Sequence, residues 1–311
     1  MTIKLSIIIV SWNTKELLKQ CLESLNKGCE GVGGYEVIVV DNGSTDGSKE
    51  YLKSQIANLK PKKPRPRNSF GIQNLKLIFN DRNLGFAKGN NIGIREARGE
   101  YIMLLNSDTI VKEGAIEKLV GFLDKNKKAA GVMPLILNEN GSVQKDPIFL
   151  RFPSPLRAFF YYNSWLKKIA SNYFPNLLFS LKDFSGVTDV EQLSGAAMIV
   201  RGNILKSIGG LDERYPYYFE DVDLSYRLKK LGYKLFMDPE AEIVHLGGRS
   251  TQKLIEKDGQ EKMFFLNFSS LFLFANKNYS KIKSSMIKLV VLTQLILKGK
   301  RNLVRKLLGN N

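Results

Sequence analysis

Short apolar runs alternate with amphipathic stretches over the first 135 residues of the chain. The runs LSIIIV, YEVIVVD, LKLIFN and YIMLLN are each followed by a stretch with helical spacing, such as LLKQCLESL or AIEKLVGFL. The first two runs are nearly continuous and rich in β-branched residues, which is typical of strands that crossover helices cover on both faces. The pattern predicts an α/β fold with a doubly wound, mostly parallel sheet flanked by helices.

The second half of the chain begins near Leu137 and is less regular. NENGSVQK has the composition of a hairpin turn, and the aromatic-rich stretches FLRFPSPLRAFFYYNSW and NYFPNLLFSL show no clear period. We expect a mobile segment here that covers the substrate. LSGAAMIVRGNILKSIGGLDE then predicts a strand, a turn and a short helix, and DLSYRLKKLGYKLFMDPEAEIVHLGG predicts a helix followed by one or two strands.

Composition and charge narrow the class of protein. The chain is 43% hydrophobic and 25% charged, as expected of a folded globular protein, and its net charge is +17. That charge comes from two acid-free segments, with seven cations in residues 51–80 and ten in residues 262–311. The remainder is neutral and carries no recognisable nucleic-acid-binding motif, so we expect no nucleic-acid partner.

Two features predict a cytoplasmic active domain. Cys21 and Cys29 are the only cysteines and form no Cys-x-x-Cys pair, which indicates reduced thiols. The apolar run at the N-terminus is too short for a signal sequence and is read as a buried first strand. The basic, proline-containing segment 58–74 is expected to be an exposed insertion, either a contact surface or a solvated linker.

The C-terminal tail, residues 262–311, has two interpretations. Its longest uncharged runs, 263–276 and 289–297, are shorter than the roughly 18 apolar residues that cross a bilayer. Cations interleaved with aromatic and aliphatic side chains suit helices that lie on an anionic membrane. A helix packed on the core with a solvated basic face has the same composition. The first interpretation predicts peripheral association with the inner face of the cell membrane.

Acidic residues follow two of the predicted strands, where ligands of parallel sheets bind. Asp41 ends VIVVD, and its carboxylate is suited to accept from a base N–H or a ribose hydroxyl; alternatively this turn caps the next helix. Asp108 closes the segment Asn106–Asp108 after YIMLL. A carboxylate there can reach Mg²⁺ or Mn²⁺ held by diphosphate oxygens.

Further candidate residues lie in the second half. Glu220, Asp221 and Asp223 crowd the start of a predicted helix, which raises a pKa and suits a base that deprotonates a sugar hydroxyl. The alternative is an acidic first turn in which Asp223 pairs with Arg227 at i,i+4. His245, the only histidine, ends an apolar strand, either as a structural residue or as a metal ligand.

The ordered motifs VSWN, VVDNGSTDGS, NLGFAKGNNIGI, LLNSD, LSGAAMIVRG, FEDVDLSYRLKKLGY and HLGGRS resemble family-2 glycosyltransferases of the GT-A fold, especially the rhamnosyltransferase-like branch. The resemblance covers residues 3–250. It implies an inverting, metal-dependent transfer from a nucleoside-diphosphate sugar, such as dTDP-rhamnose or another dTDP- or UDP-sugar, to a lipid-linked or cell-surface glycan. It divides the chain into a transferase domain, 1–261, and the tail. Within that domain, residues 1–135 form the nucleotide-sugar half and residues 136–261 form the acceptor and catalytic-base half.

The resemblance also implies roles for individual residues. Asp221 is the expected base with Glu220 beside it, and Gly195 and Ala196 border the acceptor. Asp108 and His245 are the expected ligands of Mg²⁺ or Mn²⁺. Asn106 replaces the first acid of the family's Asp-x-Asp motif, as is common in the family, and leaves Asp108 as the main carboxylate. The expected nucleotide-sugar contacts are Ser11, Trp12, Asn13, Asp41, Asn83, Gly85, Asn90 and Ser107.

Two other functions are alternatives for a chain with this alternation of strands and helices. A sugar nucleotidyltransferase usually has a glycine-rich basic loop after its first strand, where this chain has SWNTKE. A non-catalytic donor-binding protein would not need Asp108, Asp221 and His245 together.

Overall fold

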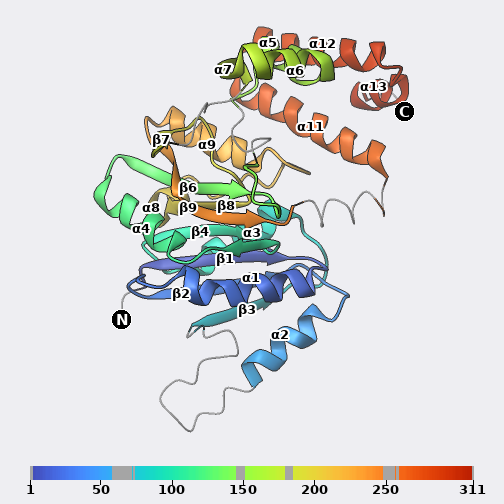
Figure 1. The fold of residues 1–311 in the computed structure, drawn as a ribbon. Helices are drawn as coiled ribbons and strands as arrows, with labels where there is room; N and C mark the ends of the chain where they lie inside the picture. The colour runs from blue at the N-terminus through green and yellow to red at the C-terminus, as the bar shows by residue number, and fades with distance from the viewer. Residues whose placement is uncertain are drawn as a thin grey trace.

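The computed structural model describes residues 3–57, 72, 74–144, 151–178, 185–247, 256 and 259–309. Within these residues, nine strands form one sheet in the order β3-β2-β1-β4-β8-β6-β9-β5, with β7 paired to β9 (Figure 1). The strands are β1 (Leu5–Ser11), β2 (Tyr35–Asp41), β3 (Leu75–Phe79), β4 (Tyr101–Asn106), β5 (Thr109–Val111), β6 (Ala129–Leu137), β7 (Thr188–Asp189), β8 (Ala197–Arg201) and β9 (Lys234–His245).

The first half of the sheet is parallel, as the apolar runs predict. β1 pairs in parallel with β2 and β4, and β2 pairs in parallel with β3. The apolar side chains of β1 are buried apart from Val10, which is partly buried, because helices cover both faces of the strand. Helix α3 (Phe86–Glu96) approaches β1 closely through two glycines. A Cβ at Gly89 would lie 2.8 Å from Val10, and one at Gly93 would lie 2.4 Å from Ile8.

The second half of the sheet is mixed. β8 runs antiparallel to both β4 and β6, whereas β6 and β9 are parallel, and β5 and β7 are antiparallel to β9. The predicted hairpin turn is confirmed, because Leu137 and Val143 form an antiparallel bridge around it. An apolar run specifies that a strand is buried but not which partner it takes or in which direction, so the mixed half was not predictable from the run.

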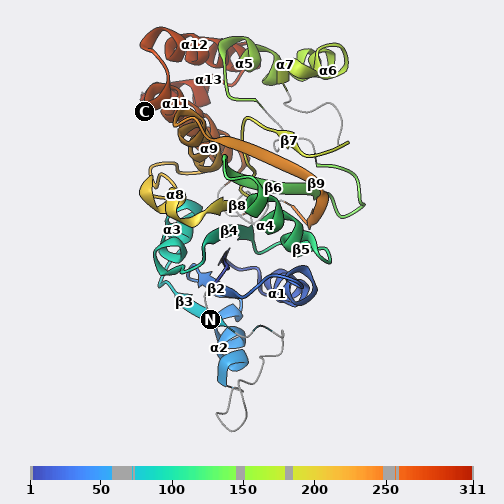
Figure 2. The same cartoon turned by 90° about the vertical axis from the view of Figure 1, so that its left-hand side faces the viewer.

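Helices cover the two faces of the sheet. α1 (Lys15–Gly28) and α4 (Ala115–Lys125) lie on one face, and α3 and α8 (Gly202–Ser207) lie on the other (Figure 2). α2 (Ser48–Ala57) follows β2, and α9 (Glu220–Lys230) packs near β9. This arrangement leaves the carboxyl ends of β1, β2 and β4 open to ligands.

A separate helical layer lies beyond the β9 side of the sheet (Figures 1 and 2). We define it as α5 (Pro155–Tyr161), α6 (Ser164–Tyr173), α7 (Pro175–Leu178), α11 (Gln260–Asn278), α12 (Lys281–Leu297) and α13 (Arg301–Leu307). Ala158 of α5 shares a hydrophobic cluster with tail residues including Leu271 and Val291. The aromatic-rich stretch therefore forms helices despite its lack of a clear period, because it packs on the tail rather than on the sheet.

The predicted basic insertion 58–74 lies outside the described residues, except for positions 72 and 74. Within the part of the chain that is described, none of the helices is both long and apolar enough to span a bilayer.

Candidate functional site

The parallel register brings the predicted strand-end residues to one edge of the sheet. Ser11 at the end of β1 is paired with Asp41 at the end of β2, and Val10 is paired with Asn106 at the end of β4. β5 lies antiparallel to β9, which pairs Thr109 with His245. Residues from distant parts of the sequence thus surround a single open edge.

A cavity of about 670 Å³ lies at this edge. Asn13 lies at the cavity in the left-handed conformation with φ 54°, and its Oδ1 accepts a 2.7 Å hydrogen bond from the Thr45 backbone N–H. Ser44 Oγ accepts from the Asn13 N–H at 2.9 Å, so the β1 and β2 loops are cross-linked. The described lining residues are Trp12, Asn13, Gly43, Thr45, Asp81, Arg82, Asn83 and Glu256.

Asp41 is buried and only partly satisfied. Its Oδ1 accepts from the Ser44 N–H at 3.0 Å, while its Oδ2 has no hydrogen-bond partner among the described residues. A buried carboxylate oxygen without a donor is costly, so a ligand N–H or O–H at this atom would be favourable. Asp41 does not cap the next helix, because α2 begins at Ser48 and Asp46 accepts from the Ser48 N–H.

The other predicted nucleotide-sugar residues differ in their surroundings. Ser11 and Ser107 are buried and joined through Thr14, whose Oγ1 lies 2.9 Å from each hydroxyl oxygen. Thr14 was missed by sequence reasoning, because its contact with Ser107 joins two strand ends far apart in the chain.

Asparagines organise the next loop. Asn83 lines the cavity and accepts from Asn42 Nδ2 and from the Gly85 N–H, and Gly85 precedes α3 with φ 86°. Asn90 is not among the described residues that line the cavity. It is 1% exposed, and its Nδ2 donates to the Phe86 carbonyl within α3.

Asp108 and His245, the expected metal ligands, lie close together. His245 Nε2 lies 3.3 Å from Asp108 Oδ1 and 3.4 Å from Asn106 Nδ2. The other ring nitrogen, Nδ1, lies 3.0 Å from Gln144 Oε1, a neighbour that the sequence pattern does not reveal. When Nδ1 carries the proton and donates to Gln144, the lone pair of Nε2 faces Asp108.

These residues fit a divalent cation held jointly with a diphosphate. The described residues contain no group of three or more acidic, histidine or cysteine side chains placed to hold a metal. A single carboxylate with one imidazole is nevertheless a sufficient protein contribution for Mg²⁺ or Mn²⁺, because phosphate oxygens and water complete the shell.

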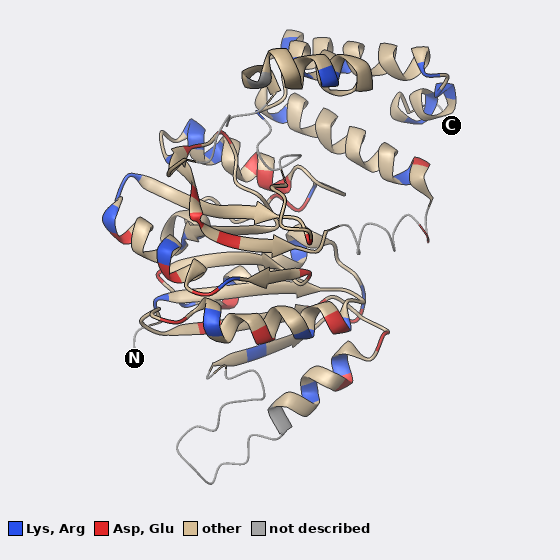
Figure 3. Ribbon diagram, in the orientation of Figure 1, with Lys and Arg blue, Asp and Glu red and all other residues tan. Residues whose placement is uncertain are grey.

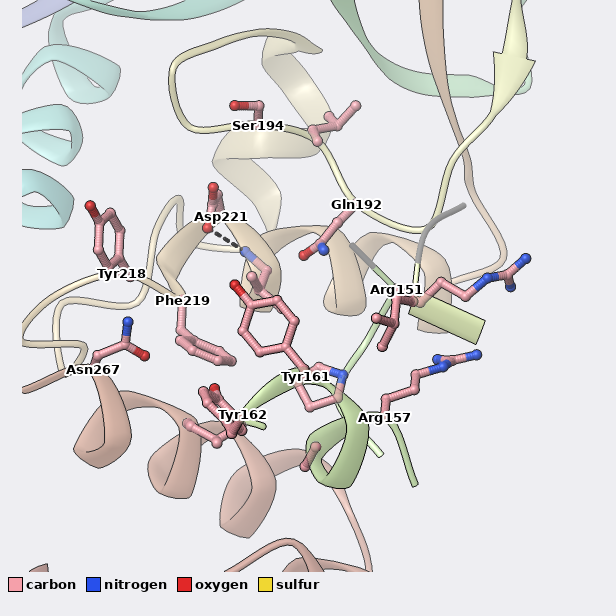
Figure 4. A pocket seen from close by; sticks show the side chains of 16 residues that line it. Arg151, Arg157, Tyr161, Tyr162, Gln192, Ser194, Tyr218, Phe219, Asp221 and Asn267 are labelled. Carbon is pink, nitrogen blue, oxygen red and sulfur yellow. Dashed lines mark hydrogen bonds between the residues drawn. The ribbon is translucent and has the colours of Figure 1, made fainter. Parts of the chain in front are cut away.

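Asp221 lies at a second cavity, of about 410 Å³, between α9 and the helical layer (Figure 4). Its Oδ2 accepts from the Gly195 N–H and its Oδ1 from the Val222 N–H, both at 2.8 Å. Burial raises the pKa of the Asp221 carboxyl, although these two donors act in the opposite direction. Gly195 and Ala196 are not among the described residues that line this cavity, but the Ala196 carbonyl accepts from the N–H of Asn106, the residue whose side chain lies beside His245.

Glu220 is buried beside Asp221. Burial, followed by the negative charge of Asp221, raises the pKa of Glu220 to about 8. The preceding residues Tyr218 and Phe219 have φ of 59° and 73°, a strained conformation for side chains of this size. Asp221 and Val222, which follow this turn, line the second cavity, whereas Glu220 is not among the described residues that line it.

Asp223 is committed to structural contacts. It is fully buried and accepts from Arg227 Nε at 2.8 Å, so the predicted i,i+4 pair is confirmed. Lys277 Nζ of α11 also donates to its two carboxylate oxygens, at 2.8 and 2.9 Å. Asp223 therefore anchors the tail to the helix that carries Asp221.

Known proteins resemble this chain in sequence. It is 27% identical over 270 residues to the N-acetylglucosaminyl-diphospho-decaprenol L-rhamnosyltransferase of Mycobacterium tuberculosis, which covers 81% of this chain and 78% of the relative. It is 25% identical over 292 residues to the rhamnosyltransferase WbbL of Escherichia coli, which covers 89% of this chain and 97% of the relative.

Solved structures resemble it in fold. The mannosyltransferase PcManGT of Pyrobaculum calidifontis, solved with GDP-mannose and Mn²⁺, superposes with a TM-score of 0.57 at 15% identity and covers 94% of this chain and 73% of that chain. A TarS structure from S. aureus gives a TM-score of 0.54 at 16% identity, with 96% and 74% coverage. The expected GT-A type fold is thereby confirmed.

The sequence profile described as "Glycosyl transferase family 2" matches residues 6–187, which is more than half of the chain. Together with the two relatives, this match confirms the predicted resemblance to rhamnosyltransferases. The chain belongs to glycosyl transferase family 2.

Proposed function

We propose that the protein transfers a sugar, of the rhamnose type, from a dTDP- or UDP-linked donor to a hydroxyl of a lipid-linked glycan, with inversion at the anomeric carbon. The convergence of Asp108 and His245 at the sheet edge where Asp41 also lies carries the proposal, because this edge then combines an acid suited to recognise the base with a pair suited to bind a metal. The relatives named for rhamnose transfer support the sugar, and one of them is named for a diphospho-decaprenol acceptor.

On the donor side, the unpartnered Oδ2 of Asp41 accepts from the base, and Trp12 and Asn13 border the nucleoside. Asp108 and His245 would hold Mg²⁺ or Mn²⁺, which would supply positive charge to stabilise the departing diphosphate. Ser107 contributes through the Ser11–Thr14–Ser107 hydroxyl chain, which fixes the loop between β4 and β5.

On the acceptor side, Asp221 removes the proton from the attacking hydroxyl. The Gly195 and Val222 N–H groups fix both carboxylate oxygens, and burial makes the carboxylate more basic than an exposed one. The hydroxyl then attacks C1 of the donor from the face opposite the diphosphate. A single displacement of this kind inverts C1 and needs no covalent enzyme intermediate.

The test is turnover of purified protein with a panel of dTDP- and UDP-sugars and a soluble N-acetylglucosaminyl diphosphate lipid, with and without Mg²⁺ or Mn²⁺. We expect metal-dependent release of nucleoside diphosphate and a product whose anomeric configuration, read by NMR, is opposite to that of the donor. Retention of configuration, or equal turnover in EDTA, would contradict the proposal.

We also propose that the helical layer rests on an anionic membrane. Residues 151–178 and 262–309 carry Lys and Arg but no acid, and Figure 3 shows the cations spread over the layer. Helix α12 is apolar on two faces. One face is buried with Ile287 and Val291, and the other exposes Ile282 (76%), Met286 (50%) and Leu289 (67%).

Other apolar side chains of the layer are also exposed. They are Leu156 and Phe159 on α5, Trp165 and Tyr173 on α6, Phe174, and Ile296 and Leu297 on α12. An exposed apolar face among cations suits insertion into an anionic headgroup region, where each cation contributes about 1 kcal/mol. The two sequence interpretations of the tail are therefore compatible, because one face packs inward while the other faces the lipid.

Flotation with anionic vesicles tests this surface in the full-length chain. We expect wild type to float at low salt, and the double variant Ile282→Ser, Leu289→Ser to float much less while keeping its thermal stability, since both side chains are exposed. Lys229→Gln on α9, outside the helical layer, is the charge-loss control. Equal flotation of wild type and the double variant would refute the proposal that this surface binds the membrane.

A further inference from the structure

The cavity at Asp221 lies between α9, with the turn before it, and the helical layer. Asp221 and Tyr218 come from α9 and the turn before it, whereas Tyr161 belongs to α5 and Asn267 to α11. In Figure 4, Arg151 and Arg157 lie on one side of the cavity, and Tyr218 and Asn267 lie on the other. A volume of about 410 Å³ accepts a monosaccharide with a charged substituent.

Cationic side chains gather on the arginine side of this cavity. Arg151 Nη1 lies 2.8 Å from Glu191 Oε1, and Arg157 Nη1 lies 3.5 Å from Glu191 Oε2, so two guanidinium groups share one carboxylate. Lys283 is a third cation in the group. Burial, with the positive charge of Arg157, lowers the pKa of its ammonium, which lies 3.4 Å from the centre of the Tyr279 ring.

The two arginines are also accessible. Their side chains are 28% and 27% exposed, so they stand at the rim, where a ligand reaches them without unfolding the site. A guanidinium has five N–H donors arranged as a fork, so a group that contacts a carboxylate can also donate to a phosphate. Charge-assisted contacts of this kind are about twice as strong as neutral hydrogen bonds.

We propose that Arg151 and Arg157 form a phosphate subsite for the acceptor. The acceptor sugar occupies the cavity with a hydroxyl at Asp221, and the phosphate or diphosphate on its anomeric carbon lies at the arginines. This inference rests on the proposed function and adds the requirement that the acceptor is a glycosyl phosphate or diphosphate. Glycans without a phosphate on the accepting sugar are poor acceptors.

The position of α5 supports a lipid on the far side of that phosphate. This one helix presents Arg157 and Tyr161 to the cavity and exposes Leu156 (57%) and Phe159 (44%). The phosphate subsite and the proposed membrane surface are therefore one helix apart. A lipid diphosphate anchored in the membrane can present its sugar to Asp221 without leaving the bilayer.

The experiment measures binding by calorimetry, without donor or vesicles. The probes are geranyl-diphospho-N-acetylglucosamine and the matched geranyl N-acetylglucosaminide, which lacks the phosphates. We expect wild type to bind the diphosphate at least about tenfold more tightly, consistent with hydrogen bonds to charged groups. Arg157→Gln removes that preference, and Arg157→Lys keeps part of it. Lys306→Gln is the matched control, because it also removes a cation that pairs with a glutamate, Glu261, in the helical layer. We expect it to behave like wild type.

Equal affinity of wild type for the two probes overturns the subsite. So does an Arg157→Gln variant that weakens both probes alike, because the arginine would then only support the fold. If that variant binds the diphosphate normally but no longer floats with anionic vesicles, the arginines contact membrane headgroups and the proposal is wrong. Failure of the proposed function appears separately, as absence of metal-dependent donor turnover, since the binding assay uses no donor.

Discussion

The buried carboxyl of Glu220 makes the stability of this protein depend on pH. Glu220 is 7% exposed, and burial with the neighbouring charge of Asp221 raises its pKa from 4.5 to about 8. The folded state therefore binds this proton more tightly than the unfolded state does. The resulting stabilisation is complete below the unfolded pKa and is lost as pH rises through the folded pKa.

The size of the effect follows from the shift. Each pKa unit corresponds to about 1.4 kcal/mol, so a gap of about 3.5 units amounts to about 5 kcal/mol in the free energy of unfolding. By the linkage relation, about 2–3 kcal/mol of this is lost between about pH 6 and pH 9. Glu220→Gln has no carboxyl to ionise and escapes this loss.

Urea unfolding of the ligand-free protein at several pH values measures the effect. We expect the unfolding free energy of wild type, relative to Glu220→Gln, to fall by about 2–3 kcal/mol across that range. Glu50→Gln, an exposed glutamate in the first turn of α2, is the matched control and should show almost no change. A difference between wild type and Glu220→Gln that stays constant, or grows in favour of wild type as pH rises, would refute the reasoning.

Four further predictions concern single side chains. Asp221→Asn should keep donor binding but lose transfer by about 10²-fold or more, as steady-state kinetics would show; near wild-type transfer would move the base elsewhere. Asp108→Ala should abolish metal-dependent nucleoside diphosphate binding in calorimetry, because Asn106 offers no charge, and unchanged binding would contradict its role. Asp41→Asn should weaken nucleoside binding about tenfold or more, whereas equal affinity would mean that its Oδ2 meets no ligand. Lys277→Met should lower the unfolding free energy by about 2 kcal/mol, since Asp223 is fully buried; an unchanged denaturation midpoint would show that Arg227 suffices.

Much of the parallel part of the sheet and of the first turn of α9 could be predicted from the sequence, because the signals are local. Continuous β-branched runs indicate strands covered on both faces, and parallel strands place Asp41 and Asn106 at a common edge. The crowding of Glu220 and Asp221 predicted a raised pKa, and the structure has both raised. The pairing of Asp223 with Arg227 followed from helical spacing alone.

Contacts between segments that are distant in the sequence were decided only by the tertiary structure. The bonds of Thr14 to Ser107, and of Gln144 to His245, join residues 93 and 101 positions apart, and no local pattern encodes such a distance. The same holds for α5, whose Ala158 packs on tail residues more than 100 positions away in the chain. Local periodicity reports which side of an element is buried. The partner that buries it is set by the packing of the whole chain, and here that packing brings Arg157 of α5 and Asp221 of α9 into one cavity.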